Sequence, residues 1–73
     1  MKTMTKYEME MLKDVEDTCN LKYEAGDSWY DLAIYVENIT FVQETHYSRS
    51  TEFIKNLQNM KETFIWCHVN KIK

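Results

Sequence analysis

The residue types that could support catalysis or metal binding are few in this chain of 73 residues. The cysteines are Cys19 and Cys67, and the histidines are His46 and His68. A cysteine nucleophile needs a base and a third group that orients the base, and structural zinc sites use paired ligands such as Cys-x2-Cys. Neither pattern is present, and Cys67 and His68, adjacent on a helix, would point about 100° apart. We therefore expect no catalytic residue, no metal and no cofactor.

Carboxylates are concentrated in the first part of the chain. Residues 1–46 hold ten acids and four bases, whereas residues 47–73 hold two acids and five bases. We expect the acids of the first segment to form a solvated helix face, because charged surfaces are normal: Glu8, Glu10, Asp14 and Asp17. Alternatively, acids of the first two segments could imitate a phosphate backbone and occupy a basic groove on a nucleic-acid-binding protein: Glu10, Asp14 and Asp17, together with Asp31 and Glu37.

The last segment carries the bases Arg49, Lys55, Lys61, Lys71 and Lys73. Binding to phosphates favours a concentrated basic face on a basic domain, whereas the whole chain has a formal net charge of −3. We do not expect direct nucleic-acid binding to be the main activity.

The first segment predicts a helix over residues 5–22. Thr5 and Glu8 fit a capping box, and Gly26 is a plausible stop signal after the helix. Apolar residues then recur at helical spacing on one broad arc: Met4, Tyr7, Met11, Leu12, Val15 and Cys19.

The middle segment is ambiguous. Ser28 and Asp31 are typical of a helix start, and Trp29, Leu32, Ala33 and Val36 form one stripe. A second stripe of Tyr30, Ile34 and Phe41 lies nearly opposite. The segment is therefore a helix with two apolar faces or, because residues 34–42 are rich in β-branched and aromatic residues, a short hairpin within residues 32–43. The helix is favoured, because the hairpin turn lacks the usual glycine.

The last segment predicts a helix over residues 50–71, capped by Ser48 or Ser50. Its apolar residues cover about half of the helical wheel: Phe53, Ile54, Leu57, Met60, Phe64, Ile65, Val69 and Ile72. The sequence therefore predicts an all-α fold, a small three-helix bundle forming a single domain over residues 1–73, with an α+β fold around a central hairpin as the alternative. We expect the first and third helices to face each other, in either relative direction.

The prediction of function depends on the large apolar residues that lie outside the predicted core. Phe64 points inward, whereas Trp66 lies off the apolar arc among polar residues, and Tyr35, Val42 and Met9 also lie off the main stripes. Exposed Trp, Tyr and Met are common interface anchors. We expect partner-binding residues to be Trp66, Tyr35, Glu10, Asp14 and Asp17, and the partner to be a larger protein, or a second copy in a homodimer.

The remaining expectations concern cellular context. No apolar run is long enough to span a membrane, and no signal peptide is evident, which predicts a cytoplasmic protein with free cysteines. The composition, rich in Met, Lys, Asn and Thr and poor in Gly, Ala and Pro, resembles that of small accessory proteins of bacteriophages and mobile elements. This predicts an inhibitor or adaptor acting on a host protein. The alternative function is a small regulator of nucleic-acid transactions, through direct binding or as an acidic mimic.

Overall fold

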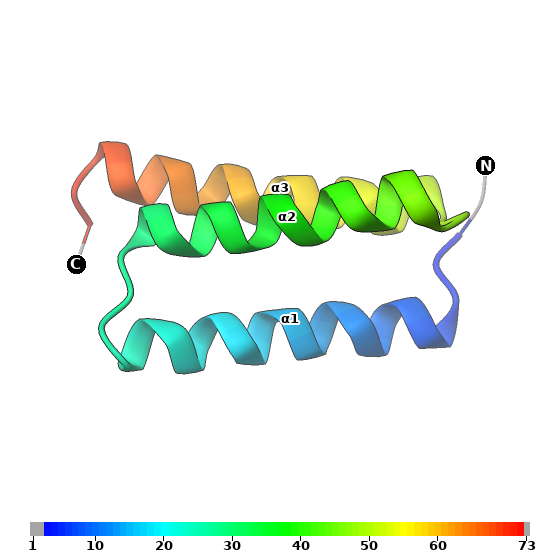
Figure 1. Ribbon diagram of the computed structural model, residues 1–73, viewed down its shortest axis with the longest axis horizontal. Helices are drawn as coiled ribbons and strands as arrows, with labels where there is room; N and C mark the ends of the chain where they lie inside the picture. Colours follow the sequence, from blue (N-terminus) through cyan, green and yellow to red (C-terminus); the bar gives the residue numbers. More distant parts are fainter. Residues whose placement is uncertain (1–2, 73) are drawn as a thin grey trace.

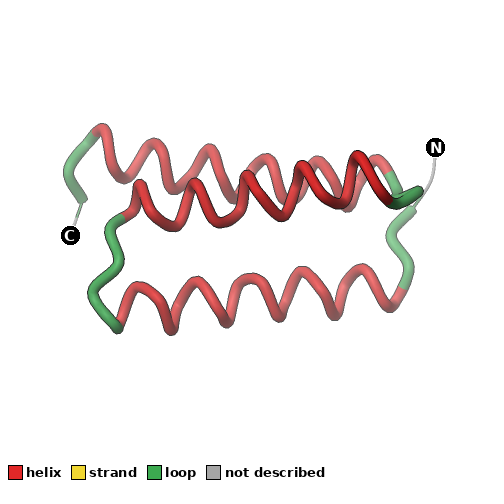
Figure 2. The backbone as a smooth tube through the Cα atoms, viewed as in Figure 1, coloured by secondary structure: helices red, strands yellow, loops and turns green. Residues whose placement is uncertain are grey.

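The computed structural model describes residues 3–72 and folds them into three helices, α1 (Lys6–Glu24), α2 (Trp29–His46) and α3 (Thr51–Val69). The chain reverses at each turn, so α2 is antiparallel to both neighbours while α1 and α3 run parallel (Figure 1). The predicted all-α bundle is confirmed. The hairpin alternative is wrong, because α2 continues through residues 32–43 and the described residues contain no strand (Figure 2).

Each helix begins at a hydroxyl cap, as the sequence predicts. Thr5 Oγ1 accepts from the Glu8 amide at 3.1 Å, Ser28 Oγ accepts from Asp31 at 3.1 Å, and Ser50 Oγ accepts from Phe53 at 3.1 Å. These bonds satisfy amides that have no partner within their own helix. Of the two candidate caps for the last helix, Ser50 is therefore the one used.

Helices α1 and α3 end in the same way. After α1, Gly26 has a φ of +107°, and the amide of Asp27 donates to the Lys22 carbonyl at 3.0 Å. After α3, Lys71 takes the corresponding position with a φ of +55°, and Ile72 donates to Cys67 at 3.0 Å. Both ends use the left-handed conformation that allows the last carbonyls to be satisfied. The predicted stop at Gly26 is confirmed.

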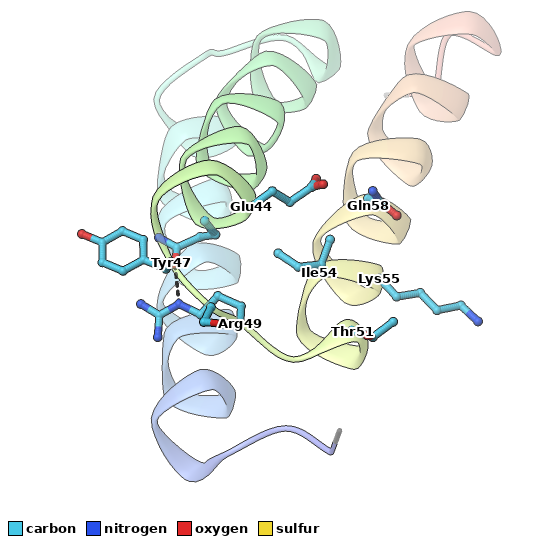
Figure 3. A pocket seen from close by; sticks show the side chains of 9 residues that line it. Glu44, Tyr47, Arg49, Thr51, Ile54, Lys55 and Gln58 are labelled. Carbon is cyan, nitrogen blue, oxygen red and sulfur yellow. Dashed lines mark hydrogen bonds between the residues drawn. The ribbon is translucent and has the colours of Figure 1, made fainter. Parts of the chain in front are cut away.

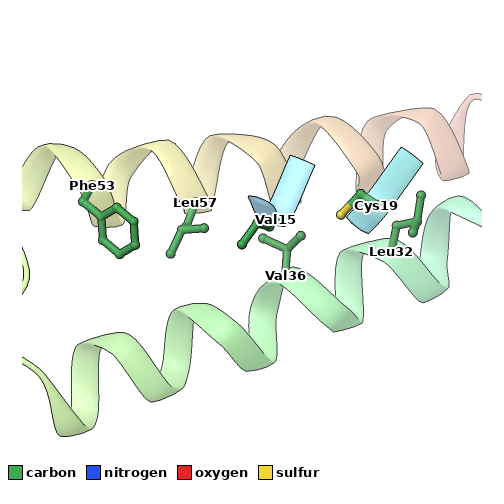
Figure 4. Packing of buried hydrophobic residues seen from close by; sticks show 6 residues of the cluster. All are labelled: Val15, Cys19, Leu32, Val36, Phe53 and Leu57. Atoms are coloured by element: carbon green, nitrogen blue, oxygen red, sulfur yellow. The ribbon is translucent and has the colours of Figure 1, made fainter. Parts of the chain in front are cut away.

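The core lies along the axis between the three helices. All three contribute to a cluster of buried side chains (Figure 4): Val15, Cys19, Leu32, Val36, Phe53 and Leu57. Half-buried apolar residues surround this cluster, including Met11, Leu12 and Phe64. Their burial supplies the main favourable free energy of folding.

The closest helix pair is α2 with α3, and α1 packs less closely against both of them. The first and third helices do face each other, as expected, but the contact between α2 and α3 is the most extensive. α1 covers one side of the α2–α3 pair (Figure 1).

Polar and aromatic contacts at the two ends of α1 fasten it to this pair. At its N-terminal end, Glu8 accepts hydrogen bonds from Ser50 of α3's cap. At its C-terminal end, the ring of Tyr23 stacks on Trp29 with centroids 4.4 Å apart, and Trp29 stacks on Phe64 at 5.8 Å. Stacked rings contribute beyond the area that they bury.

Several residues of the predicted apolar arcs are nevertheless exposed. Tyr7 is 59% exposed, Val69 68% and Ile72 43%. A bundle of three helices offers each helix only two neighbours, so a stripe that covers half the wheel cannot be buried completely. The width of the arc on α3 therefore leaves apolar side chains on the surface.

Candidate functional site

Trp66 lies on the outward side of α3, as its helical phase predicts. Its side chain is 58% exposed, and it lines a shallow surface hollow together with Asn59, Glu62 and Thr63 of the same helix. We call these four residues the Trp66 face. Phe64, two positions earlier, is half-buried and packs against the core, which confirms the helix phase. A large exposed ring with polar neighbours has the form of an interface anchor.

The other predicted partner-binding residues lie elsewhere. Glu10, Asp14 and Asp17 are exposed on α1, and Asp17 forms an ion pair with Lys13 at 3.7 Å. Tyr35 on α2 is half-buried, with the Lys22 ammonium 4.8 Å from its ring centroid. The structure therefore places Tyr35 at the contact between α1 and α2. Trp66, with hollow-lining neighbours from α3 alone, does not share a surface with it.

Glu8 departs from the sequence prediction. It is 3% exposed rather than part of a solvated face. Its Oε2 accepts from the Ser50 amide at 2.9 Å, and its Oε1 accepts from Ser50 Oγ and from the Thr5 amide, both at 2.9 Å. The carboxylate therefore sits at the N-terminal ends of two helices, where negative charge is stabilised.

The electrostatics of Glu8 follow from these bonds. Hydrogen bonds from the Ser50 amide and, to a smaller extent, from the Thr5 amide lower the pKa of Glu8 below its ordinary value. The Ser50 hydroxyl and the positive charge of Arg49 also lower it, and together these contributions outweigh the effect of burial, which raises the pKa. The carboxylate is ionised at neutral pH and serves as a structural acceptor. With its oxygens occupied by three donors, it is not arranged as a general acid or base.

Arg49 occupies the turn between α2 and α3. Its Nε donates to Gln43 Oε1 at 2.6 Å (Figure 3), and its guanidinium lies 4.7 Å from the Tyr47 ring centroid and 5.2 Å from that of Tyr7. Cation–π contacts of this kind stabilise a partly buried arginine. Arg49, Gln43 and Tyr47 also border an open hollow of about 550 Å³, from which the side chain of Lys55 extends away (Figure 3). Since Arg49 is already engaged inside the molecule, this hollow is not arranged as an anion site.

A second apolar surface lies along the side of the α2–α3 pair that α1 leaves uncovered. Tyr30 is 54% exposed, Ile34 41%, Phe41 65% and Ile65 41%. Two observations place these helix faces beside each other. The ring centroids of Tyr30 and His68 are 5.3 Å apart, and Phe41 of α2 lines one groove together with Gln58 and Lys61 of α3. We call this surface the outer seam and define it by eight residues: Tyr30, Ile34, Glu37, Phe41, Gln58, Lys61, Ile65 and His68.

The outer seam faces away from α1 by the geometry of α2. Leu32 and Val36, which pack with the α1 residues Val15 and Cys19, belong to the core. At about 100° per residue, Tyr30 and Phe41 lie roughly 120–180° around the helix from them. The second apolar stripe of α2, ambiguous in the sequence, therefore belongs to an exposed surface.

The chemistry-bearing residues are dispersed. Cys19 is buried and Cys67 half-buried, both as free thiols, and burial raises the pKa of the Cys19 thiol. Between residues 3 and 72, no three Cys, His, Asp or Glu side chains gather in a way that could hold a metal ion. His68 is exposed beside Tyr30. Across the same part of the chain, no helix has the length and apolar character required to traverse a bilayer.

Comparison with known proteins finds no matching family model, no matching curated protein and no matching solved structure.

Proposed function

We propose that this chain is a small non-enzymatic protein-binding module, an inhibitor or adaptor of the type that bacteriophages and mobile elements direct at a larger host protein. The observation that carries the proposal is the Trp66 face. A tryptophan ring more than half exposed, on the outward side of a capped helix, contributes little to the core of its own chain. Binding interfaces concentrate their energy in such aromatic anchors, with polar neighbours that exclude water once a partner is bound.

The charge of α1 supports a contribution from electrostatics. Glu10, Asp14 and Asp17 are exposed on this helix, and Lys13 is the one described base that pairs with them. An acidic strip of this kind speeds encounter with a basic surface and selects against acidic ones. It is also the feature that favours the second candidate, an acidic mimic of nucleic acid that regulates nucleic-acid transactions. In either case the partner is a protein.

Direct nucleic-acid binding is less well supported. The bases of α3 are dispersed: by helical phase, Lys55 and Lys61 point about 120° apart. Arg49 is held by Gln43 and by aromatic rings. Lys73 lies outside the described residues. A concentrated basic face, which phosphate contacts require, does not form among the bases that the structure describes.

Affinity capture from the source cells or their host, read by mass spectrometry, tests the proposal. We expect one dominant protein partner with the native chain and at least about tenfold weaker capture with Trp66→Ala. Phe41→Ala is the matched control, because Phe41 is similarly exposed but lies on the outer seam. Co-purifying nucleic acid that survives Trp66→Ala would contradict the proposal, and so would equal capture by native and Trp66→Ala chains.

A further inference from the structure

We propose that the outer seam is a self-association surface, on which a second copy of this chain docks so that α2 of each copy lies over α3 of the other. The proposal concerns the chain by itself and does not depend on the Trp66 face or its partner. It rests on the spacing of the seam residues, on their exposure and on their charges.

The spacing is that of a helix-bundle seam. On α2 the residues follow each other at steps of four, three and four: Tyr30, Ile34, Glu37 and Phe41. On α3 the steps are three, four and three: Gln58, Lys61, Ile65 and His68. Alternation of three and four is the heptad pattern by which helices pack side by side over a long distance. Both helices therefore carry a second packing stripe in addition to the one that forms the core.

The two stripes are in register with each other. Because α2 and α3 are antiparallel, the contact between Tyr30 and His68 at one end places Ile34 at the level of Ile65 and Glu37 at the level of Lys61. The groove that Glu37, Phe41 and Lys61 line together confirms this alignment at the other end. The seam is therefore a series of layers, with isoleucines in one layer and a charged pair in the next.

The charges select a second copy as the occupant. α2 contributes Glu37, and beyond it Glu44, to this side, whereas α3 contributes Lys61. The ion pairs found among residues 3–72, Lys13–Asp17 and Lys22–Asp27, involve neither Glu37 nor Lys61. A surface with an acidic and a basic half side by side is complementary to itself under a twofold rotation, which is the commonest symmetry of homodimers.

The same charges fix the direction of the twofold axis. An axis along the helices places α2 of one copy over α3 of the other, so that Glu37 meets Lys61 and Ile34 meets Ile65. An axis across the helices would place α2 over α2 and α3 over α3, so that neither Glu37 nor Lys61 would meet a seam residue of opposite charge. Complementary charges fix the register of an interface, so the axis runs along the helices. The two copies then share a four-helix arrangement that buries Ile34, Phe41 and Ile65.

Chain length gives an independent reason for the dimer. A domain of this size buries only about 60% of its unfolded surface, and seven hydrophobic residues are buried among residues 3–72. Small scaffolds commonly gain stability by oligomerising. Covering the outer seam would give α2 and α3 a second packed face each without any change in the fold.

Sedimentation equilibrium on the purified chain tests the proposal. We expect a dimer mass for the native chain and at least about a tenfold rise in the dimer Kd for Ile65→Glu and for Glu37→Lys. The double variant Glu37→Lys with Lys61→Glu should recover dimerisation, because the pairing is restored in reverse. Circular dichroism verifies that each variant remains helical, and Trp66→Ala is the control that should stay dimeric.

Cysteine cross-linking tests the axis. In a Cys19→Ala, Cys67→Ala background, copies carrying Ile34→Cys are mixed with copies carrying Ile65→Cys and oxidised. We expect the mixture to cross-link faster than either variant alone. A monomer mass for the native chain at the highest attainable concentration would overturn the proposal, as would a dimer that is unaffected by both Ile65→Glu and Glu37→Lys. Preferential cross-linking of Ile34→Cys to itself would overturn the axis.

Discussion

The two sides of the α2–α3 pair have similar apolar residues and opposite surroundings. On the side that α1 covers, Leu32, Val36 and Leu57 are buried to 1% exposure or less. On the other side, Ile34 and Ile65 are 41% exposed and Phe41 is 65% exposed. The difference does not come from the hydrophobicity of the residues. It comes from the number of helices in the chain, since a single α1 can cover only one side of the pair.

The largest effect is expected on the covered side. Phe53→Ala removes a fully buried ring and leaves a cavity, which costs about 3–5 kcal/mol of unfolding free energy. Small domains have only about 5–15 kcal/mol in total, so the variant should be largely unfolded on mild heating. Thermal and urea denaturation followed by circular dichroism measure this loss. A change of less than about 1 kcal/mol would contradict the core assigned to Phe53.

The next effect concerns the fastening of α1 to the pair. Glu8→Gln places an amide nitrogen where the carboxylate now accepts from Ser50 or Thr5. One donor then loses its acceptor, and the charge at the two helix ends is lost. We expect a lower Tm than for the native chain at neutral pH. Ser50→Ala should also lower it, because the α3 cap is removed and Glu8 loses a hydrogen bond.

The contribution of Glu8 has a defined pH dependence. The pKa of Glu8 in the folded chain lies below its ordinary value of about 4.5, so its stabilisation is fully present above that pH and is lost as the pH falls through the folded pKa. The gap in Tm between native and Glu8→Gln chains should therefore be widest near neutral pH and close in acid. A gap that stays constant down to strongly acidic pH would show that ionised Glu8 does not stabilise the fold.

A smaller effect on folding is expected on the uncovered side. Phe41→Ala removes a ring that is mainly exposed, and surface substitutions usually change stability by less than about 0.5 kcal/mol. The measurement is urea denaturation at low protein concentration, where a self-associating chain is monomeric. The loss of unfolding free energy should therefore be much smaller for Phe41→Ala than for Phe53→Ala. A loss near that of Phe53→Ala would mean that Phe41 packs within its own chain.

The smallest difference is expected between the two cysteines, which are buried to different extents. Cys19 is buried, its thiol pKa is raised, and Cys67 is half-buried. The thiolate is the reactive form, so a thiol reagent should modify Cys67 before Cys19 in the folded chain. Peptide mapping after brief labelling measures the order. Equal rates in native buffer, together with equal rates in urea, would show that the packing of α1 against α2 and α3 does not protect Cys19.

Local sequence patterns predict much of this architecture. Thr5 with Glu8, Ser28 with Asp31, and Ser50 mark the three helix starts, because hydroxyl and carboxylate caps act on amides within three residues. The arc through Val15 and Cys19 and the outward phase of Trp66 follow from helical periodicity alone. These features depend on neighbours along the chain, so a linear reading is sufficient to find them.

Other features depended on contacts between distant residues. The bond from Ser50 to Glu8 joins positions 42 residues apart, and no local pattern predicts that a capping glutamate will also cap another helix. Which helices form the close pair was likewise decided in three dimensions, since the apolar arcs of the first and last segments match as well as those of the second and third. The two stripes of α2 left helix and hairpin open in the sequence. The tertiary structure decides for the helix. α1 covers one apolar stripe of α2, and because a single helix cannot cover both, the other stripe lies exposed on the outer seam.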